Sequence, residues 1–298
     1  MTVVPVDELR PLSFAVAYRM LGSVAEAEDV VQEALLRLHD ADDVDNPEAW
    51  LTTTTTRLAI DVLRSARVRR ERYVGDWLPE PLVEDAGTTQ IEDEETISLA
   101  FLVLLERLTP EERAVLVLRD AFDYSFAEIA QIIGKSEDNT RQILSRARRH
   151  VDDERPRFDP DPEQRFELAE RFLQAARDGD MDGLVEMLAP DAVLTGDGGG
   201  KAIAIGRPLV GAEPIAHALR AFAVRGFEYW NVRLEPALVN GQPGFRTFDA
   251  EDRLINVISV DIVDGRVARV YSMLNPDKLG HLADEISTAG LKPQFRGG

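Results

Sequence analysis

The sequence predicts a multidomain protein in which two all-helical domains precede an α+β domain with an antiparallel sheet. Three observations predict it. Residues 7 to 152 carry helical periodicity, residues 164 to 280 mix helices with strands joined by hairpin turns, and an acidic stretch divides the helical part in two. With 298 residues, 44% of them hydrophobic, the chain is long enough to bury more than one core.

The first helical domain begins with two helices between residues 7 and 39, which are separated at Gly22 and Ser23. A third helix follows Asn46, which is a good N-cap, and Pro47, which suits a first helical turn. That helix contains the run "TTTTT", residues 52 to 56. Because β-branched residues are poor helix formers, the run suggests a face of the helix that carries hydroxyl groups.

The second helical domain shows a helix, a glycine turn and a basic helix. Thr109 caps a helix that opens with Pro110, Gly134 supplies the turn, and Ser136 caps the last helix. This order predicts a helix-turn-helix, although a plain three-helix core is the alternative.

The α+β domain opens with two helices, the first of which ends at Gly179, and continues with a strand near Ala192 and a further helix over residues 210 to 222. Four strand-like runs follow, namely "YWNVRLEPALVN", which begins at Tyr229, "GFRTFDA", "RLINVISVDIV" and "RVARVYSML". The turns that join them are Asn240-Gly241, Glu251-Asp252 and Asp264-Gly265.

Composition excludes several kinds of site. The chain has no cysteine and four histidines, none of them paired at ligand spacing, so we expect no metal and no cofactor. The start "MTVVPVDELRPLSF" lacks a basic flank and an apolar core, and no apolar run reaches the length of a membrane span. These features predict a soluble, cytoplasmic protein without a membrane partner.

Charge is distributed unevenly along the chain. The net charge of −20 argues against nucleic-acid binding, yet residues 57 to 72 hold six arginines against two acids, and residues 141 to 149 hold four arginines and no acid. Residues 76 to 95, between these clusters, hold eight acids and no base. Either cluster alone could be a solvated helix face. Two clusters separated by an acidic stretch make a patterned chain, in which the distribution of charge matters more than the total.

The run "TGDGGGKA", residues 195 to 202, could be a phosphate loop, a flexible turn or a surface of close approach. A phosphate loop needs a following helix, whereas the "AIAIG" after Lys201 predicts a strand. We therefore expect a turn that lets another backbone approach, with Asp197 and Lys201 as polar clamps. The segment "DWLPEPL", residues 76 to 82, or the first helical domain is the expected neighbour.

The α+β domain also contains groups that could act as general acids or bases. They are Asp191, Asp197, Asp249, His217, Tyr229 and Tyr271. No spacing pairs them, so we predict that the protein is not an enzyme.

The helical half resembles an extracytoplasmic-function (ECF) sigma factor. "AEAEDVVQEALLRL" and "NPEAWLTTTTTRLAIDVLRSARVRRER" resemble its region 2, and "LTPEERAVLVLRDAFDYSFAEIAQIIGKSEDNTRQILSRARRHV" resembles its region 4. The resemblance implies binding to core RNA polymerase, at the β′ clamp and the β flap, and to the minus-ten and minus-thirty-five promoter elements. The implied polymerase-binding residues are Asp29, Val30, Gln32 and Glu33.

Residue chemistry and this resemblance together predict the DNA contacts. Extruded bases need pockets with polar edges, and arginines follow the phosphate backbone. Polar side chains on a recognition helix bond to base edges. The candidates are Asn46, Trp50, Arg64, Arg67, Arg69, Arg70, Asn139, Arg141, Gln142, Ser145, Arg146 and Arg149.

The α+β half resembles SnoaL-like domains, in which a curved sheet wraps over helices into a cone with an apolar pocket. The motifs "WLPEPL", "DGGGK" and "NPDKL" resemble an ECF subgroup whose fused SnoaL-like domain takes over regulation. The implied regulatory contact comprises Trp77, Leu78, Pro79, Asp197, Gly198, Gly199, Gly200, Lys201, Asn275, Pro276, Asp277 and Lys278.

The expected domains are 1–73 (region 2), 74–97 (an acidic linker, here called the connector), 98–155 (region 4), 164–280 (the SnoaL-like domain) and 281–298 (a tail). An unknown small ligand in the pocket and the direction of regulation stay open. The alternative function is a DNA-binding regulator whose SnoaL-like half senses or converts a small molecule.

Overall fold

A computed structural model describes residues 6–42, 44–70, 73–85, 97–151, 161–229 and 231–287. The chain forms two compact units. The first unit comprises Met1–Arg72 and Phe101–Arg155, and the second comprises Tyr73–Ala100 and Pro156–Gly298. The second unit therefore includes a segment that lies, in sequence, between the two helical domains.

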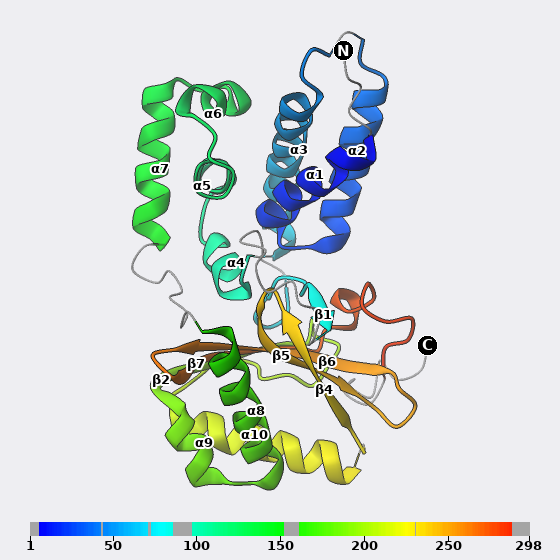
Figure 1. Ribbon diagram of the computed structural model, residues 1–298, viewed down its shortest axis with the longest axis vertical. Helices are drawn as coiled ribbons and strands as arrows, with labels where there is room; N and C mark the ends of the chain where they lie inside the picture. Colours follow the sequence, from blue (N-terminus) through cyan, green and yellow to red (C-terminus); the bar gives the residue numbers. More distant parts are fainter. Residues whose placement is uncertain are drawn as a thin grey trace. The chain divides into compact units, whose positions relative to one another are not determined.

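Three helices begin the first unit: α1 (Val6–Leu21), α2 (Val24–His39) and α3 (Pro47–Arg70), which pack on one another (Figure 1). The hydroxyl of Ser23 accepts a hydrogen bond from the Glu26 amide and caps α2. The Asn46 side chain accepts one from the Ala49 amide, at 3.1 Å, and caps α3. Both predicted helix starts are confirmed.

The threonine run does not form an exposed hydroxyl face. Thr52, Thr55 and Thr56 are buried, and the Thr55 hydroxyl lies 2.7 Å from that of Ser13 on α1. Small β-branched side chains let α1 and α3 pack closely, which explains their presence in a helix that they disfavour by propensity. Packing therefore accounts for three of the five threonines.

The second helical domain contains α4 (Leu99–Leu105), α5 (Pro110–Asp120), α6 (Phe126–Ile133) and α7 (Glu137–Val151). Thr109 with Glu112, and Ser125 with Glu128, form reciprocal capping boxes at the starts of α5 and α6. Gly134 ends α6 in the left-handed conformation. The predicted helix, glycine turn and basic helix are confirmed.

The second unit is built on a seven-stranded sheet in the order β1-β4-β5-β6-β7-β2-β3. All neighbouring strands are antiparallel except β2 and β7, which pair in parallel. The strands are β1 (Val83–Asp85), β2 (Leu188–Asp197), β3 (Leu209–Val210), β4 (Arg233–Val239), β5 (Gln242–Phe248), β6 (Leu254–Val263) and β7 (Arg266–Met273).

Three helices cover one face of this sheet (Figure 1): α8 (Pro162–Asp178), α9 (Met181–Met187) and α10 (Ala212–Tyr229). The core between them contains Phe172, Leu184, Ile215 and Val270. Gly179 ends α8, and the turns at Asn240-Gly241 and Asp264-Gly265 adopt positive φ angles, as predicted. The α+β fold class is confirmed, with one parallel strand pair in addition.

Two local predictions are wrong. Residues 203–206, within the predicted strand "AIAIG", form no strand. The amides of Lys201 and Ala202 donate to the Gly198 carbonyl, so the backbone turns here and does not extend along a neighbouring strand. Tyr229 ends α10 and does not begin a strand. The helix α10 therefore continues seven residues beyond its predicted end at Phe222.

Strand β6 carries a buried carboxyl group, that of Asp261. The Asp261 side chain has no hydrogen-bond partner among the described residues, and burial raises its pKa to about 7. Because the folded pKa lies above the ordinary value of 3.8, the fold is most stable while Asp261 keeps its proton. Stability is therefore lost as the pH rises from about 4 to about 7.

We predict that Asp261→Asn stabilises the chain above pH 7, because a neutral amide avoids the cost of a buried charge. The free energy of unfolding in urea should rise by about 2 kcal/mol at pH 8 and change little at pH 4. The matched control Asp191→Asn, at an exposed position on β2, should have no such dependence on pH. An equal effect of Asp261→Asn at both pH values would contradict the argument.

Candidate functional site

The connector is built into the sheet of the second unit. Its strand β1 pairs with β4 in antiparallel register, with Val83 opposite Val239. Figure 1 shows β1, in cyan, beside the red C-terminal segment. Edge strands expose unpaired backbone groups, and pairing with β4 satisfies those of residues 83 to 85. The segment predicted as a linker thus contributes a strand to the sheet, over residues 83 to 85.

Asp197, at the end of β2, is fully buried, and its two carboxylate oxygens bind Tyr73, which precedes the connector, and the connector itself. Oδ1 accepts a hydrogen bond from the Tyr73 hydroxyl at 2.6 Å. Oδ2 accepts one from the Leu78 amide at 2.9 Å and lies 2.8 Å from the Lys278 ammonium. We call Tyr73, Leu78, Asp197, Asn275 and Lys278 the Asp197 cluster.

Lys278 belongs to the short 3-10 helix η2 (Pro276–Lys278), and its side chain is 8% exposed. Besides Asp197, its ammonium donates to the Leu78 carbonyl. It also lies 4.1 Å from the centre of the Trp77 ring and 4.9 Å from that of Tyr73. Two aromatic faces and a carboxylate therefore replace the water that this cation gives up on burial.

Acidic groups crowd the cluster. Burial, together with the hydrogen bond to Asp197, raises the pKa of the Tyr73 hydroxyl, so Tyr73 stays protonated and donates. Burial and the charge of Asp197 also raise the pKa of Asp76. The Asn275 amide donates to the Tyr73 hydroxyl at 2.7 Å and joins the C-terminal segment to the start of the connector.

The glycine run approaches both segments. Gly199 has a φ of +56°, and a Cβ atom there would overlap the Asn275 side chain. Gly200 has a φ of +75°, and its Cβ would lie 3.0 Å from Val74 of the connector. Both positions therefore require glycine for conformation and for space. Lys201 forms an ion pair of 2.7 Å with Asp277 at the surface.

The predicted regulatory residues are thus brought together within the second unit. Leu78 is 2% exposed and Pro79 is buried. Gly198 is packed too closely against the Ala202 carbonyl to carry a side chain. Pro276 starts η2.

Two contacts of the connector were not foreseen from the sequence. Asn240, predicted only as a turn residue, accepts from the Leu82 amide at 3.0 Å and donates to the Ile97 carbonyl at 3.0 Å. His281 lies 2.8 Å from the Pro81 carbonyl. An Asn-Gly turn is common in hairpins, so its sequence carries no sign of this second role. Asn240 holds the connector at two points that are 15 residues apart.

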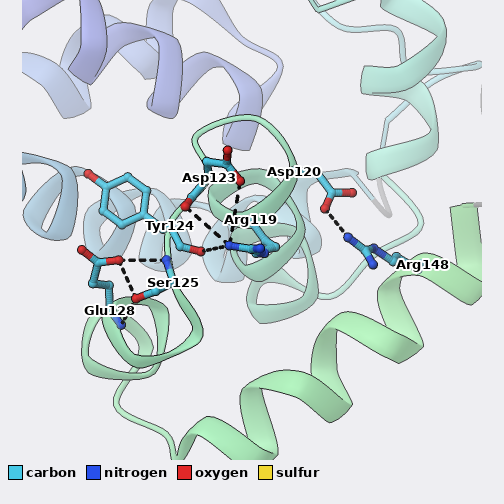
Figure 2. A network of polar contacts seen from close by, with 7 residues as sticks. All are labelled: Arg119, Asp120, Asp123, Tyr124, Ser125, Glu128 and Arg148. Carbon is cyan, nitrogen blue, oxygen red and sulfur yellow. Dashed lines mark hydrogen bonds and ion pairs between the residues drawn. The ribbon is translucent and has the colours of Figure 1, made fainter.

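The exposed side of α7 carries the predicted recognition residues. Asn139, Gln142 and Ser145 are exposed, as are Arg141, Arg146 and Arg149. Arg141 pairs with Glu137 at 2.8 Å and lies over the Phe126 ring. Figure 2 shows that Arg148 instead bonds to Asp120 of α5, while Arg119 and the Ser125 capping box hold the turn before α6.

The structure describes the side chains of only some of the predicted DNA-binding residues in and before α3. Trp50 is half-buried beside Leu51 in a small apolar cluster, and Asn46 is exposed with its side-chain oxygen used as the helix cap. Arg64 is exposed and pairs with Glu111 of α5 at 2.8 Å. The side chains of Arg67, Arg69 and Arg70 lie outside the described residues.

Helix α2 presents Asp29, Gln32 and Glu33 to solvent. Val30 is 4% exposed and packs inside the three-helix domain, so its polymerase contact stays a prediction and the exposed surface of α2 is formed by other residues. The apolar side chain that α2 does present is Leu36, which is 55% exposed.

Four arginines connect the two helical domains within the first unit. Arg57 donates to the carbonyls of Ile132 and Gln131, at 2.8 and 3.0 Å, at the end of α6. Arg113 is buried and donates to the Met20 carbonyl at 2.8 Å. The other two contacts are Arg64 with Glu111 and Arg19 over the ring of Phe122.

The described residues offer no evident catalytic pair. The cavity on the helix-covered face of the sheet has four polar lining residues, Arg177, Thr247, Asn256 and Ser272, and its lining contains no carboxylate. Asp249 is committed to its own turn and to Ser287. Among the described residues, no group of His, Asp or Glu could hold a metal ion, and no helix is long and apolar enough to cross a membrane.

We predict that Lys278→Met destabilises the docked connector, because it leaves the buried carboxylate of Asp197 without its cation. The cost should be about 3 kcal/mol, or roughly a 150-fold faster hydrogen exchange at the Leu78 amide. Asp197→Asn in the same chain should recover part of this loss. The control Lys201→Met removes an exposed ion pair between the same two segments and should cost less than about 1 kcal/mol. Equal effects of the two lysine variants would refute the role of burial.

Comparison with known proteins places this geometry in a family. Three family models match: Sigma-70 region 2 over residues 6–69, Sigma-70, region 4 over residues 98–151, and the SnoaL-like domain over residues 169–271. The chain is 39% identical over 293 residues to the ECF RNA polymerase sigma factor SigJ of Mycobacterium tuberculosis, which covers 93% of each chain.

A second relative is the probable ECF RNA polymerase sigma factor SigI of Mycobacterium tuberculosis, 32% identical over 278 residues, or 91% of this chain and 92% of SigI. The crystal structure of Mycobacterium tuberculosis SigJ superposes with a TM-score of 0.76 at 36% identity, covering 92% of this chain and 96% of that one. Both relatives are sigma factors by name, not enzymes. The chain therefore belongs to the family of ECF RNA polymerase sigma factors, with sigma-70 regions 2 and 4 followed by a C-terminal SnoaL-like domain.

Proposed function

We propose that this sigma factor binds core RNA polymerase in the cytoplasm, directs initiation at its own promoters, and is regulated by its SnoaL-like domain through the connector. One observation supports the proposed regulation by the SnoaL-like domain. The segment that joins region 2 to region 4 is held by a buried ion pair and a strand pairing of the SnoaL-like domain. Release of that segment therefore changes how far the two DNA-binding regions can separate.

The exposed polar side of α2 is the proposed contact with the β′ clamp. Asp29, Gln32 and Glu33 supply hydrogen-bonding groups, and Leu36 supplies an apolar side chain with 55% of its surface free. An exposed leucine beside charged groups suits a protein interface, in which apolar anchors are surrounded by polar contacts.

DNA binding requires the two regions to separate. The minus-ten and minus-thirty-five elements are named for positions about 25 base pairs apart, or roughly 85 Å at about 3.4 Å per base pair. In the first unit, by contrast, the side chain of Arg57 reaches the backbone at the end of α6. The first unit is thus a closed arrangement, which we propose opens on polymerase.

The connector sets the reach of this opening. Fully extended, its 24 residues (74 to 97) span roughly 80 Å at about 3.4 Å per residue. Docking holds residues 74 to 85, and Asn240 bonds to both the Leu82 amide and the Ile97 carbonyl, so the end of the connector is held as well. A docked connector therefore cannot extend to let regions 2 and 4 part, and this favours the closed arrangement.

We predict that Lys278→Met raises promoter-specific transcription. The test reconstitutes the full chain with core RNA polymerase and measures transcripts from a cognate promoter. Release of the connector should increase output several-fold, whereas Lys201→Met should behave like the unchanged chain. Failure of every variant to bind core polymerase would refute the sigma-factor function itself, and binding without a difference between the lysine variants would refute only the regulation.

We also predict that locking the closed first unit blocks initiation. The chain has no cysteine, so Arg57→Cys with Gln131→Cys can be joined selectively by a short bismaleimide that contains a disulfide. The cross-linked chain should bind core polymerase through α2 yet give no transcript, and reduction of the linker should restore output. Chains with one of the two cysteines serve as controls. Full activity of the cross-linked chain would show that no opening is needed.

A further inference from the structure

After η2, the C-terminal chain runs along the connector (red in Figure 1). The ammonium of Lys278 donates to the Leu78 carbonyl. Three residues further along both segments, Nε2 of His281 lies 2.8 Å from the Pro81 carbonyl. Leu279, between these two contacts, is fully buried. We call residues 279 to 287 the strap.

The far end of the strap is joined to the sheet at the start of β6. The Leu254 amide donates to the Glu285 carbonyl at 3.2 Å, and the Leu254 carbonyl accepts from the Ser287 amide at 2.8 Å. Ile286 therefore pairs with Leu254 in parallel. The pairs of β6 with β7 begin at Val257, so this edge of Leu254 is left for the strap.

A buried side-chain contact reinforces the same end. The Ser287 hydroxyl donates to Oδ2 of Asp249, and the two residues are 3% and 4% exposed. Burial alone would raise the pKa of Asp249, but the hydrogen bonds from Ser287 and from its own turn lower it, so the group accepts as a carboxylate. Oδ2 also accepts from Nε of Arg253 at 2.9 Å, and Oδ1 accepts from the amides of Glu251 and Arg253, both at 3.0 Å. The turn after β5 therefore keeps these bonds if the hydroxyl of Ser287 is removed.

The two ends of the strap support each other. A segment that is held at one end stays close to its second contact, so its effective concentration there is high. Release of residues 285 to 287 would let the strap leave the connector and would expose Leu279 beside the buried ammonium of Lys278. Water at this ammonium would weaken its ion pair with Asp197, because exposed ion pairs contribute little.

We propose that Ser287 and Asp249 form a latch that holds the strap over the connector, and that opening of this latch releases the connector from the Asp197 cluster. Ser287 is then a positioning residue, which acts on Leu78 through the strap and Lys278. The latch itself is a property of the free chain. Its consequence for transcription rests on the regulation proposed above.

Hydrogen exchange in the free full chain tests the latch. Ser287→Ala should speed exchange of the Leu78 and Leu82 amides, both bound in the docked connector, by about fivefold to tenfold, as loss of one hydrogen bond to a charged group gives. Exchange at Val260, inside β6, should not change, because the turn keeps its other bonds. Unchanged exchange at Leu78, or an equal increase at Val260, would overturn the latch.

Asp252→Asn is the matched control. Asp252 lies in the same turn as Asp249, is exposed, and pairs with Arg233 at 2.7 Å. Asparagine tolerates the left-handed conformation of this position, where φ is +61°. Exchange at Leu78 should match that of the unchanged chain. Faster exchange in this control would assign the effect to the turn and overturn the role of the Ser287 hydroxyl.

A double variant tests the route through the strap. In a chain that carries Lys278→Met, the near end is already released, so adding Ser287→Ala should change exchange at Leu78 little further. Full additivity of the two effects would overturn this route. With core polymerase, Ser287→Ala should raise transcription in the same direction as Lys278→Met. Faster exchange without a change in transcription would refute the regulation proposed above and leave the latch standing.

Discussion

The buried ion pair between Asp197 and Lys278 is the interaction on which docking of the connector depends. It joins the end of β2, the C-terminal helix η2 and the connector, three segments that are far apart in the sequence. A carboxylate with no exposed surface is costly unless it is fully bonded, and here Tyr73, Leu78 and Gly199 supply the remaining donors. Loss of any one segment exposes or unpairs a charge, so the three segments dock together.

The sheet places this ion pair one residue away from a cavity. On β2 and β7, the period of two sends Leu194, Gly196 and Val270 to the helix-covered face, whereas Asp197 points to the connector. A change on either face therefore acts on the same backbone.

Local chemistry made the helices and hairpins predictable, whereas most contacts between distant segments could not be predicted from the sequence. Ser23, Thr109, Gly134 and Gly179 end or begin helices through groups within a few residues of each terminus, so their sequence neighbourhood suffices. The glycine run was expected to allow a close approach, and Gly199 and Gly200 do so. Tyr73 and Asn240 were missed, because a tyrosine after a basic run and an asparagine in a hairpin carry no local sign of a partner in another segment.

Several arginines of the first unit bond to groups within that unit. These contacts suggest how an acidic protein can be specific for DNA. Arg57 and Arg64, from the basic cluster of α3, bond to region 4, and Arg141 bonds to acids on its own helix. These cations are therefore partly neutralised while the unit is closed, and the net charge of −20 further repels phosphates. Separation of the two regions on polymerase would release Arg57 and Arg64 where promoter DNA is held. Under the opening that we propose, affinity for DNA would arise at the place of initiation and stay low elsewhere.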